Sequence, residues 1–272
     1  MTEASSVKYS VRSESIPQFF LPPESLHDKA FHLIGPEAFH LVKVLRYQVG
    51  QPLTLFNGKG GRFSGVIEKI HADGSVSGRL TATLESAAEK PEVQLNLYQG
   101  LLKASHWEFV LEKGTELGVS AFYPTLTPRT VVLLREADRV KAKAERWGRI
   151  VMAASKQCRR AVLPEVKEPV EFRDAIRAVQ GKGLTVVAWE GLSGATARET
   201  LRETFARGRE RLAEKDFAVN LFIGPEGGFS EEEIELAESV GAVLFGMGSR
   251  VLRAETATLA ACALIQYELG SL

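Results

Sequence analysis

The 272-residue sequence lacks several features that would direct a functional assignment immediately. It has two cysteines, Cys158 and Cys262, which are too few and too far apart for a disulfide framework or a cysteine-rich metal site. No apolar run is long enough to span a bilayer, and no secretory signal pattern stands at the start. We therefore expect a cytoplasmic protein with no structural metal and no membrane segment.

The chain also lacks net charge, because 34 lysines and arginines balance 34 aspartates and glutamates. This balance argues against a protein that coats nucleic acid indiscriminately, although it is compatible with a local basic patch. The G-x-G-x-x-G pattern of conventional Rossmann domains is absent. The turn at 58–62 (GKGGR) lacks the spacing and the Lys-Ser/Thr ending of a phosphate-binding loop, which favours a hairpin turn.

Residues 1–88 contain short apolar or alternating runs separated by glycine-rich turns. These runs lie at 52–56, 62–70 and 74–84. Asn57-Gly58 and Asp73-Gly74 between such runs are strong hairpin signals. One helix with Pro36 near its first turn interrupts the strands, and its candidate buried positions are Phe39, Leu41, Val42, Val44 and Leu45. The pattern predicts a small β-barrel with one helix, followed by a polar linker at 84–91.

Residues 89–272 instead alternate strand and helix patterns. Strands are predicted at 93–97, 184–189, 218–223 and 242–245, and helices at 105–118, 136–157, 169–181 and 255–269. Ser105 with Glu108 is interpreted as a capping box that opens the first of these helices, and Gly118 as its end. The alternation predicts a parallel sheet covered by helices on both faces.

The segment 221–233 (LFIGPEGGFSEEE) has the features of a ligand-binding turn. An apolar strand ends in a glycine-rich turn, and Ser230 with Glu233 predicts a capping box on the following helix. Such a turn opens backbone N–H and C=O groups to a flat ligand, at the strand end where open α/β sheets bind ligands. A plain tight connection is the alternative, but it requires neither Pro225 nor Glu226.

A second segment, 246–257 (GMGSRVLRAETA), follows the next predicted strand. Arg250 and Arg253 at a strand end beside a helix N-terminus can bind a phosphate or the polar edge of a base. The alternative is a surface ion pair, for example between Arg253 and Glu255. Because the two segments end successive strands about twenty residues apart, one site can use both.

Together these segments resemble the paired signature motifs of the RsmE family of 16S ribosomal RNA (uracil-N3) methyltransferases, within the SPOUT superfamily. Further similarity lies at 40–46 (HLVKVLR), 113–119 (KGTELGV) and 155–160 (SKQCRR), so it extends over almost the whole chain. The sequence departs from the family pattern at Gln18, Lys156 and Arg159. These departures leave the cofactor motifs intact and bear on how RNA docks.

The resemblance implies a PUA-like RNA-binding barrel at 1–88 and a SPOUT methyltransferase domain at 89–272, with a trefoil knot at about 185–272. It implies a homodimer that uses S-adenosyl-L-methionine to methylate N3 of uridine 1498, in the usual numbering, in 16S rRNA of the small ribosomal subunit. The implied cofactor-binding residues are Trp189, Glu190, Gly191, Ile223, Gly224, Pro225, Glu226, Gly227, Gly228, Met247, Gly248, Val251, Leu252, Arg253 and Thr256. The implied RNA-binding residues are Lys43, Arg46, Arg62, Lys156, Gln157, Arg159 and Arg160.

The candidate catalytic residues are Arg253, Arg250 and Glu255. An arginine would stabilise the developing uracil anion or hold an adjacent phosphate, while Glu255 and Glu226 would organise the loops. No general base is identified: His40 and His106 have no evident partner in the sequence, and neither is assigned a catalytic role.

Residues 129–160 hold ten lysines and arginines against three acidic residues, a balance typical of phosphate contacts. A solvated helix face explains the same charges equally well. Two other functions stay open: a SPOUT enzyme that modifies another rRNA or tRNA site, and a non-catalytic RNA-binding factor in ribosome assembly. A phosphohydrolase is a distant third, because no acidic metal-binding cluster accompanies the glycine turn.

Overall fold

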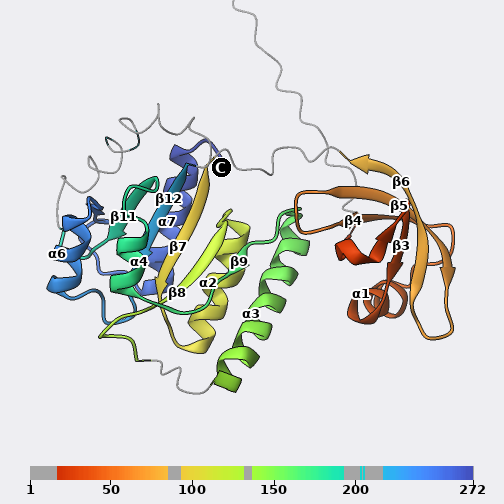
Figure 1. Ribbon diagram of the computed structural model, residues 1–272, viewed down its shortest axis with the longest axis horizontal. Helices are drawn as coiled ribbons and strands as arrows, with labels where there is room; N and C mark the ends of the chain where they lie inside the picture. The colour runs from red at the N-terminus through yellow and green to blue at the C-terminus, as the bar shows by residue number, and fades with distance from the viewer. Residues whose placement is uncertain are drawn as a thin grey trace, which may run out of the picture. The chain divides into compact units, whose positions relative to one another are not determined.

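The computed structural model describes residues 17–84, 93–131, 137–192, 203, 205 and 217–271. The chain splits into two compact units, Met1–Ser86 and Ala87–Leu272 (Figure 1). The linker predicted at 84–91 lies, apart from its first residue, outside the described residues. None of the described helices is both long enough and apolar enough to cross a membrane.

The N-terminal unit is a six-stranded, PUA-like sheet. Its strands are β1 (Gln18–Phe20), β2 (Leu26–His27), β3 (Ala30–Leu33), β4 (Pro52–Phe56), β5 (Arg62–Ile70) and β6 (Val76–Leu84), in the order β1-β4-β5-β6-β3-β2. All neighbours are antiparallel except β1 and β4. The predicted runs at 52–56 and 62–70 are confirmed as β4 and β5, and the third strand begins at Val76 rather than Gly74.

The helix of this unit buries fewer apolar residues than the sequence predicts. It consists of α1 (Gly35–Phe39), with Pro36 in its first turn, followed directly by a π-helical turn (His40–Val44). Leu41 is buried as predicted, whereas the predictions for Phe39, Val44 and Leu45 are wrong, since all three are exposed. The five predicted positions do not lie on one face of a helix, so packing against the sheet buries only part of them.

The C-terminal unit is built on a parallel sheet. Its strands are β7 (Gln94–Gly100), β8 (Ala121–Leu126), β9 (Glu165–Val166), β10 (Val170–Glu171), β11 (Leu184–Ala188), β12 (Ala218–Ile223) and β13 (Val243–Phe245). The order is β10-β8-β7-β12-β11-β13, with β9 also beside β8, and every pairing is parallel. The predicted parallel sheet is therefore confirmed, and β11, β12 and β13 are neighbours.

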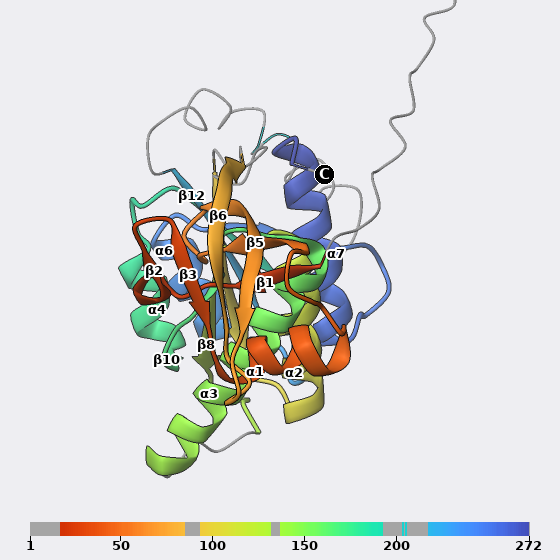
Figure 2. The ribbon, with the colours of Figure 1, turned by 90° about the vertical axis from the view of Figure 1, so that its right-hand side faces the viewer.

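Helices cover both faces of this sheet, as predicted (Figures 1 and 2). They are α2 (Ala104–Glu116), α3 (Ala137–Cys158), α4 (Phe172–Ala178), α6 (Glu231–Ser239) and α7 (Ala254–Glu268). Helix α2 packs against both α3 and α7, and α4 packs against α6. Leu95 and Leu97 of β7 join the core under α2 and α7, whereas Tyr98 stacks on Phe222 in the core under α4 and α6, with ring centroids 4.4 Å apart.

One helix start differs from its prediction and another agrees. The capping box predicted at Ser105 and Glu108 is wrong: α2 begins at Ala104, and its N-cap residue, Lys103, makes no side-chain capping bond. The buried residues Leu101 and Leu102 lead directly from β7 into α2, which brings the helix start forward. The capping box on α6 is confirmed, because the Glu233 amide donates to Ser230 Oγ and the Ser230 amide donates to Glu233 Oε2.

The trefoil knot expected at about 185–272 stays a prediction. Residues 193–202, 204 and 206–216 of that segment lie outside the described part of the chain. What the structure places is the set of three strand ends that the knot would join, those of β11, β12 and β13.

Candidate active site

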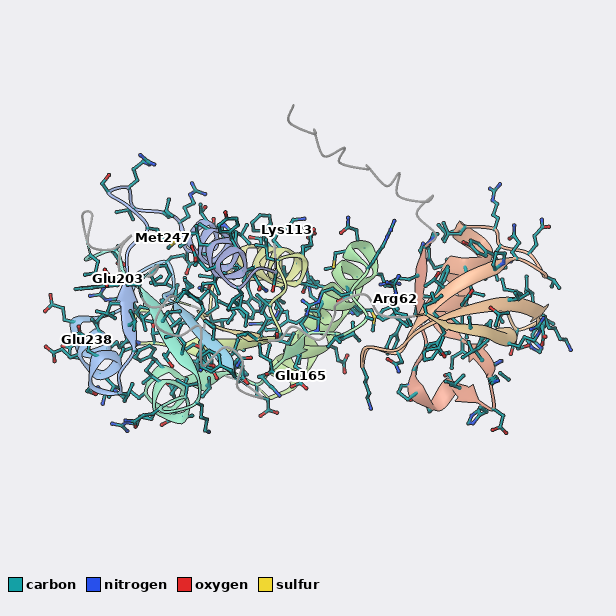
Figure 3. All side chains as sticks on the ribbon, turned by 90° about the horizontal axis from the view of Figure 1, so that it is seen from above. Arg62, Lys113, Glu165, Glu203, Glu238 and Met247 are labelled. Carbon is teal, nitrogen blue, oxygen red and sulfur yellow. The ribbon has the colours of Figure 1, made fainter. Side chains whose placement is uncertain are left out.

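A cavity of about 450 Å³ opens beyond the carboxyl ends of β11, β12 and β13. This volume falls within the range of small-molecule and cofactor sites. Met247, labelled in Figure 3, contributes from the loop that follows β13. The cavity therefore lies where two glycine-rich segments leave β12 and β13, the two strands that flank β11 in the sheet.

Most of the residues expected to bind a cofactor line this cavity. Of those fifteen, all do so except Gly191, Gly227 and Thr256. The predicted catalytic residues Arg250, Arg253 and Glu255 line it as well. Residues that the sequence did not single out for this role complete the wall, and they are His106, Ala188, Ser249, Ala254 and Ala257.

A buried glutamine connects three elements of the site. Gln99, in β7, donates through Nε2 to the carbonyl of Gly224 at 3.0 Å, and its Oε1 accepts a hydrogen bond from the Thr258 hydroxyl of α7. The side chain is fully buried, where a polar group needs partners. Gln99 thus links β7, the turn after β12 and the last helix. Gln99 was not among the residues predicted for the site, although a polar residue at the carboxyl end of a buried strand is a usable signal.

The turn at 224–228 is also fixed by close backbone approach and by an arginine. A Cβ atom on Gly100 would lie only 2.2 Å from the backbone nitrogen of Pro225, so β7 can approach the turn only with glycine there. Arg129 donates through Nη1 to the carbonyls of Gly227 and Phe229, each at 3.0 Å. These contacts hold the turn from two sides.

Several arginines of the basic segment at 129–160 have structural contacts, among them Arg146, which binds the Glu108 carboxylate of α2 through Nε and Nη2. Arg129 is occupied by the glycine turn, and Arg160 donates through Nη1 to the carbonyls of Thr115 and Val119, at 2.9 and 2.8 Å. Arg160, predicted to bind RNA, therefore stabilises the end of α2. The side chains of residues 132–141, which include three further basic residues of this segment, lie outside the description.

The other predicted RNA-binding residues lie in both units. At the end of α3, Gln157 and Arg159 are exposed and Lys156 is half-buried; in the N-terminal unit, Lys43 and Arg46 are exposed and Arg62 is half-buried. Gln18, where the sequence departs from the family pattern, is 4% exposed, so its side chain does not lie on the surface of β1. No RNA contact of these residues is tested by the geometry, and they remain predictions.

The loop from Met247 to Leu252 differs from the glycine turn. None of its residues forms a hydrogen bond to another residue in the described part of the chain, and Val251 is 85% exposed. Arg253 occupies the N-cap position of α7 without a side-chain capping bond. The ion pair between Arg253 and Glu255 that the sequence allowed is not formed among the described residues.

Glu255 instead faces a histidine. Its Oε2 lies 3.9 Å from Nδ1 of His106, and Oε1 of Glu226 lies at the same distance from that nitrogen. Nδ1 is buried and has no hydrogen-bond partner, while Glu226 Oε1 also accepts from the Lys103 amide at 3.2 Å. His106 was not predicted to have a role, because both carboxylates lie far from it in the sequence. The available signal was its position just after the end of the strand β7.

Comparison with known families agrees with this geometry. The family model described as an RNA methyltransferase domain matches residues 88–266, which include both glycine-rich segments and most of α7. The chain belongs to the RNA methyltransferase family. The model described as an RNA methyltransferase PUA domain matches residues 33–80 of the N-terminal unit.

Relatives of this RNA methyltransferase match over most of its length. It is 31% identical to ribosomal RNA small subunit methyltransferase E of Bacillus subtilis (strain 168), over 88% of this chain and 90% of the relative. It is 32% identical to the protein of that name from Synechocystis sp., over 92% and 77%. The crystal structure of ribosomal RNA small subunit methyltransferase E from Neisseria gonorrhoeae, bound to S-adenosyl methionine, has a TM-score of 0.78 and 27% identity, and covers 93% of this chain and 98% of that one.

Proposed function

We propose that this protein transfers the methyl group of S-adenosylmethionine to N3 of a uridine in the 16S rRNA of the small ribosomal subunit. The observation that carries the proposal is the cavity formed by the two glycine-rich segments at the ends of β11, β12 and β13. It is supported by membership of the RNA methyltransferase family and by relatives named for the small ribosomal subunit. Because ribosomal RNA is the substrate, we expect the enzyme to act in the cytoplasm.

The residues present fit S-adenosylmethionine. Ile223 and Leu252 offer apolar surface for its flat ring, and the carboxylates of Glu190 and Glu226 complement its positive sulfonium and amino groups. Gly228 has a φ of +68°, a conformation that L side chains rarely adopt, and a Cβ atom there would lie 2.3 Å from Glu190 Oε1. When bound, the cofactor supplies a methyl group activated by the sulfonium centre.

Arg250 and Arg253 provide the electrostatic part of the reaction. Both line the cavity from the exposed loop before α7 and from its N-cap position. N3 of uracil attacks as its anion, and a guanidinium beside it stabilises the negative charge as this charge develops. Positioning the base in line with the methyl group supplies a further part of the rate. The target base must therefore be unstacked or single-stranded when it is bound.

We further propose that the enzyme acts as a homodimer. Phe109 of α2 and Leu264 and Tyr267 of α7 are large apolar side chains that are exposed on two neighbouring helices. Exposed apolar surface of this kind marks protein–protein contacts. Sedimentation equilibrium should give twice the chain mass, and Tyr267→Lys should shift the population towards the monomer. An unchanged distribution in this variant would place the contact elsewhere.

The test of the function is methyl transfer from labelled S-adenosylmethionine to small ribosomal subunits that lack the modification. Nucleoside mass spectrometry should show 3-methyluridine, and a reaction without subunits serves as the control. A different methylated nucleoside would indicate another target atom. RNA binding without methyl transfer, by a folded protein that binds the cofactor, would support an assembly factor instead.

A further inference from the structure

His106 lies in the cavity wall with its two ring nitrogens in different environments. Nδ1 is buried and lies 3.9 Å from a carboxylate oxygen of Glu226 and of Glu255. The side chain as a whole is 38% exposed and borders the cavity, so the opposite nitrogen, Nε2, is the one available to a ligand. A histidine with a carboxylate behind one nitrogen and a substrate space before the other has the arrangement of a general base.

Both carboxylates are held in place by the fold. Glu226 Oε1 accepts the amide hydrogen of Lys103, one turn before His106 on the same helix. Glu255 lies in the first turn of α7, where the helix dipole favours its charge, and its side chain is only 13% exposed. The charged and titratable groups that line the cavity with the imidazole are therefore Glu190 after β11, Glu226 on the turn after β12, Arg250 and Arg253 before α7, and Glu255 in α7.

We propose that His106 is the general base that removes the N3 proton of the bound uracil. The proposal rests on the function proposed above. Neutral His106 carries its proton on Nδ1, which faces Glu226 and Glu255, so that Nε2 offers its lone pair to the substrate. The N3–H bond breaks as the Nε2–H bond forms. N3 then uses its lone pair for the new carbon–nitrogen bond, and the electron pair of the broken carbon–sulfur bond stays with the donor's sulfur.

The two carboxylates stabilise His106 most strongly after it has accepted the proton. The imidazolium formed in this step carries a positive charge, and it faces two negative groups within ion-pair distance. The guanidinium groups of Arg250 and Arg253 meanwhile stabilise the anionic base. The exposed edge of the ring then returns the extra proton to water. His106 thus removes the proton, and Arg250 and Arg253 stabilise the resulting anion.

The first test compares His106→Gln with the wild type in single-turnover methyl transfer across a range of pH. Glutamine keeps a polar side chain of similar length but cannot accept the proton. We expect the rate to fall about 100-fold or more at neutral pH. The variant's rate should then rise in proportion to hydroxide concentration, whereas the wild-type rate levels off. Equal rates and equal pH profiles would overturn the proposal.

Chemical rescue provides a second readout. Imidazole added to His106→Ala should restore part of the methyl transfer, with a dependence on the neutral form of the added base. S-adenosylmethionine should still bind to the variant in calorimetry, and the variant should still unfold cooperatively, so that the loss of rate can be assigned to the missing base. A variant that loses cofactor affinity and gains nothing from imidazole would show that His106 only shapes the cavity, contrary to the proposal.

A third measurement does not depend on activity. Nitrogen-15 spectra of the imidazole distinguish the two neutral tautomers, and we expect the Nδ1–H form for His106 in the wild type. Glu255→Gln should weaken this preference, whereas the matched variant Glu231→Gln, in the first turn of α6, should leave it unchanged. A dominant Nε2–H tautomer in the wild type would contradict the assignment. Failure of the wild type to form 3-methyluridine would instead remove the proposed function.

Discussion

The two glycine-rich segments of the cavity follow β12 and β13, the two neighbours of β11, yet they are held very differently. The turn at 224–228 is fixed by Gln99 through Gly224, by Arg129 through Gly227 and by close contact with Gly100. The loop at 247–252 forms no hydrogen bond to another described residue. Similar composition at equivalent places in one sheet therefore gives one fixed wall and one free wall.

This difference suits a site with two ligands. A fixed turn keeps its shape before the cofactor arrives, which lowers the entropy lost on binding. The free loop at 247–252 carries Arg250 and leads into Arg253, the N-cap residue of α7, and it can adapt to an RNA strand because no hydrogen bond to another described residue must be broken when it moves. We therefore expect changes behind the fixed turn to affect stability and cofactor binding, and changes in the free loop to affect turnover.

The largest effect should come from Gly100→Ala, which breaks the fixed wall. The new methyl group would overlap the backbone of Pro225, so β7 and the turn must separate. We expect a loss of about 3 kcal/mol in the free energy of unfolding and cofactor binding at least about tenfold weaker. Urea unfolding and calorimetry measure both. The control is Gly148→Ala in α3, where the added methyl meets no atom within 4 Å and should stabilise slightly.

Arg253→Ala should show most clearly that changes near the free loop affect turnover and not stability. We expect methyl transfer to fall about 100-fold, because one donor to the developing anion is lost. The free energy of unfolding should change by less than about 0.5 kcal/mol, since no described hydrogen bond depends on the side chain. Arg173→Ala, on the exposed side of α4, is the matched control and should alter neither quantity. Unchanged turnover and RNA affinity in Arg253→Ala would remove this arginine from the reaction.

Gln99→Met should weaken the fixed wall without crowding it. The substitution leaves the Gly224 carbonyl without this donor in a buried environment, which costs about 1–3 kcal/mol of stability. Thr258→Val removes the partner on α7, and the double variant should lose less than the sum of the single losses. Strict additivity in thermal or urea unfolding would mean that Gln99 does not couple the turn to α7.

The smallest effect should be that of Glu233→Gln, in the first turn of α6, the helix that follows the fixed turn. Burial raises the pKa of the Glu233 carboxyl above its usual value, so its contribution to stability falls as pH rises from about 4.5 through the folded-state pKa. Glutamine keeps the acceptor for the Ser230 amide. We expect a gain of at most about 0.5 kcal/mol at pH 7 and none below pH 4. A loss at pH 7 would show that the charge at the helix N-terminus outweighs its burial.

Local patterns predicted most of the elements, as particular cases illustrate. The apolar run at 218–223 and the Asn57-Gly58 turn predicted the right strands, because the composition of a buried strand and turn chemistry act over a few residues. The capping box of α6 was predicted for the same reason. The capping box predicted at Ser105 and Glu108 was wrong, because burial of Leu101 and Leu102 places the start of α2 at Ala104. The exposed side chains of Phe39 and Val44 were missed because apolar residues on different faces of the helix were all taken as buried.

The sequence by itself determined the alternating β and α elements, the two glycine-rich turns and the residue types that a methyltransferase cavity requires. Only the tertiary structure decided which distant side chains meet: Gln99 with Gly224 and Thr258, and His106 with Glu226 and Glu255. The physical reason is one of range. Backbone preferences and periodicity depend on near neighbours in the chain, whereas the partners of a buried polar group depend on which strands lie side by side.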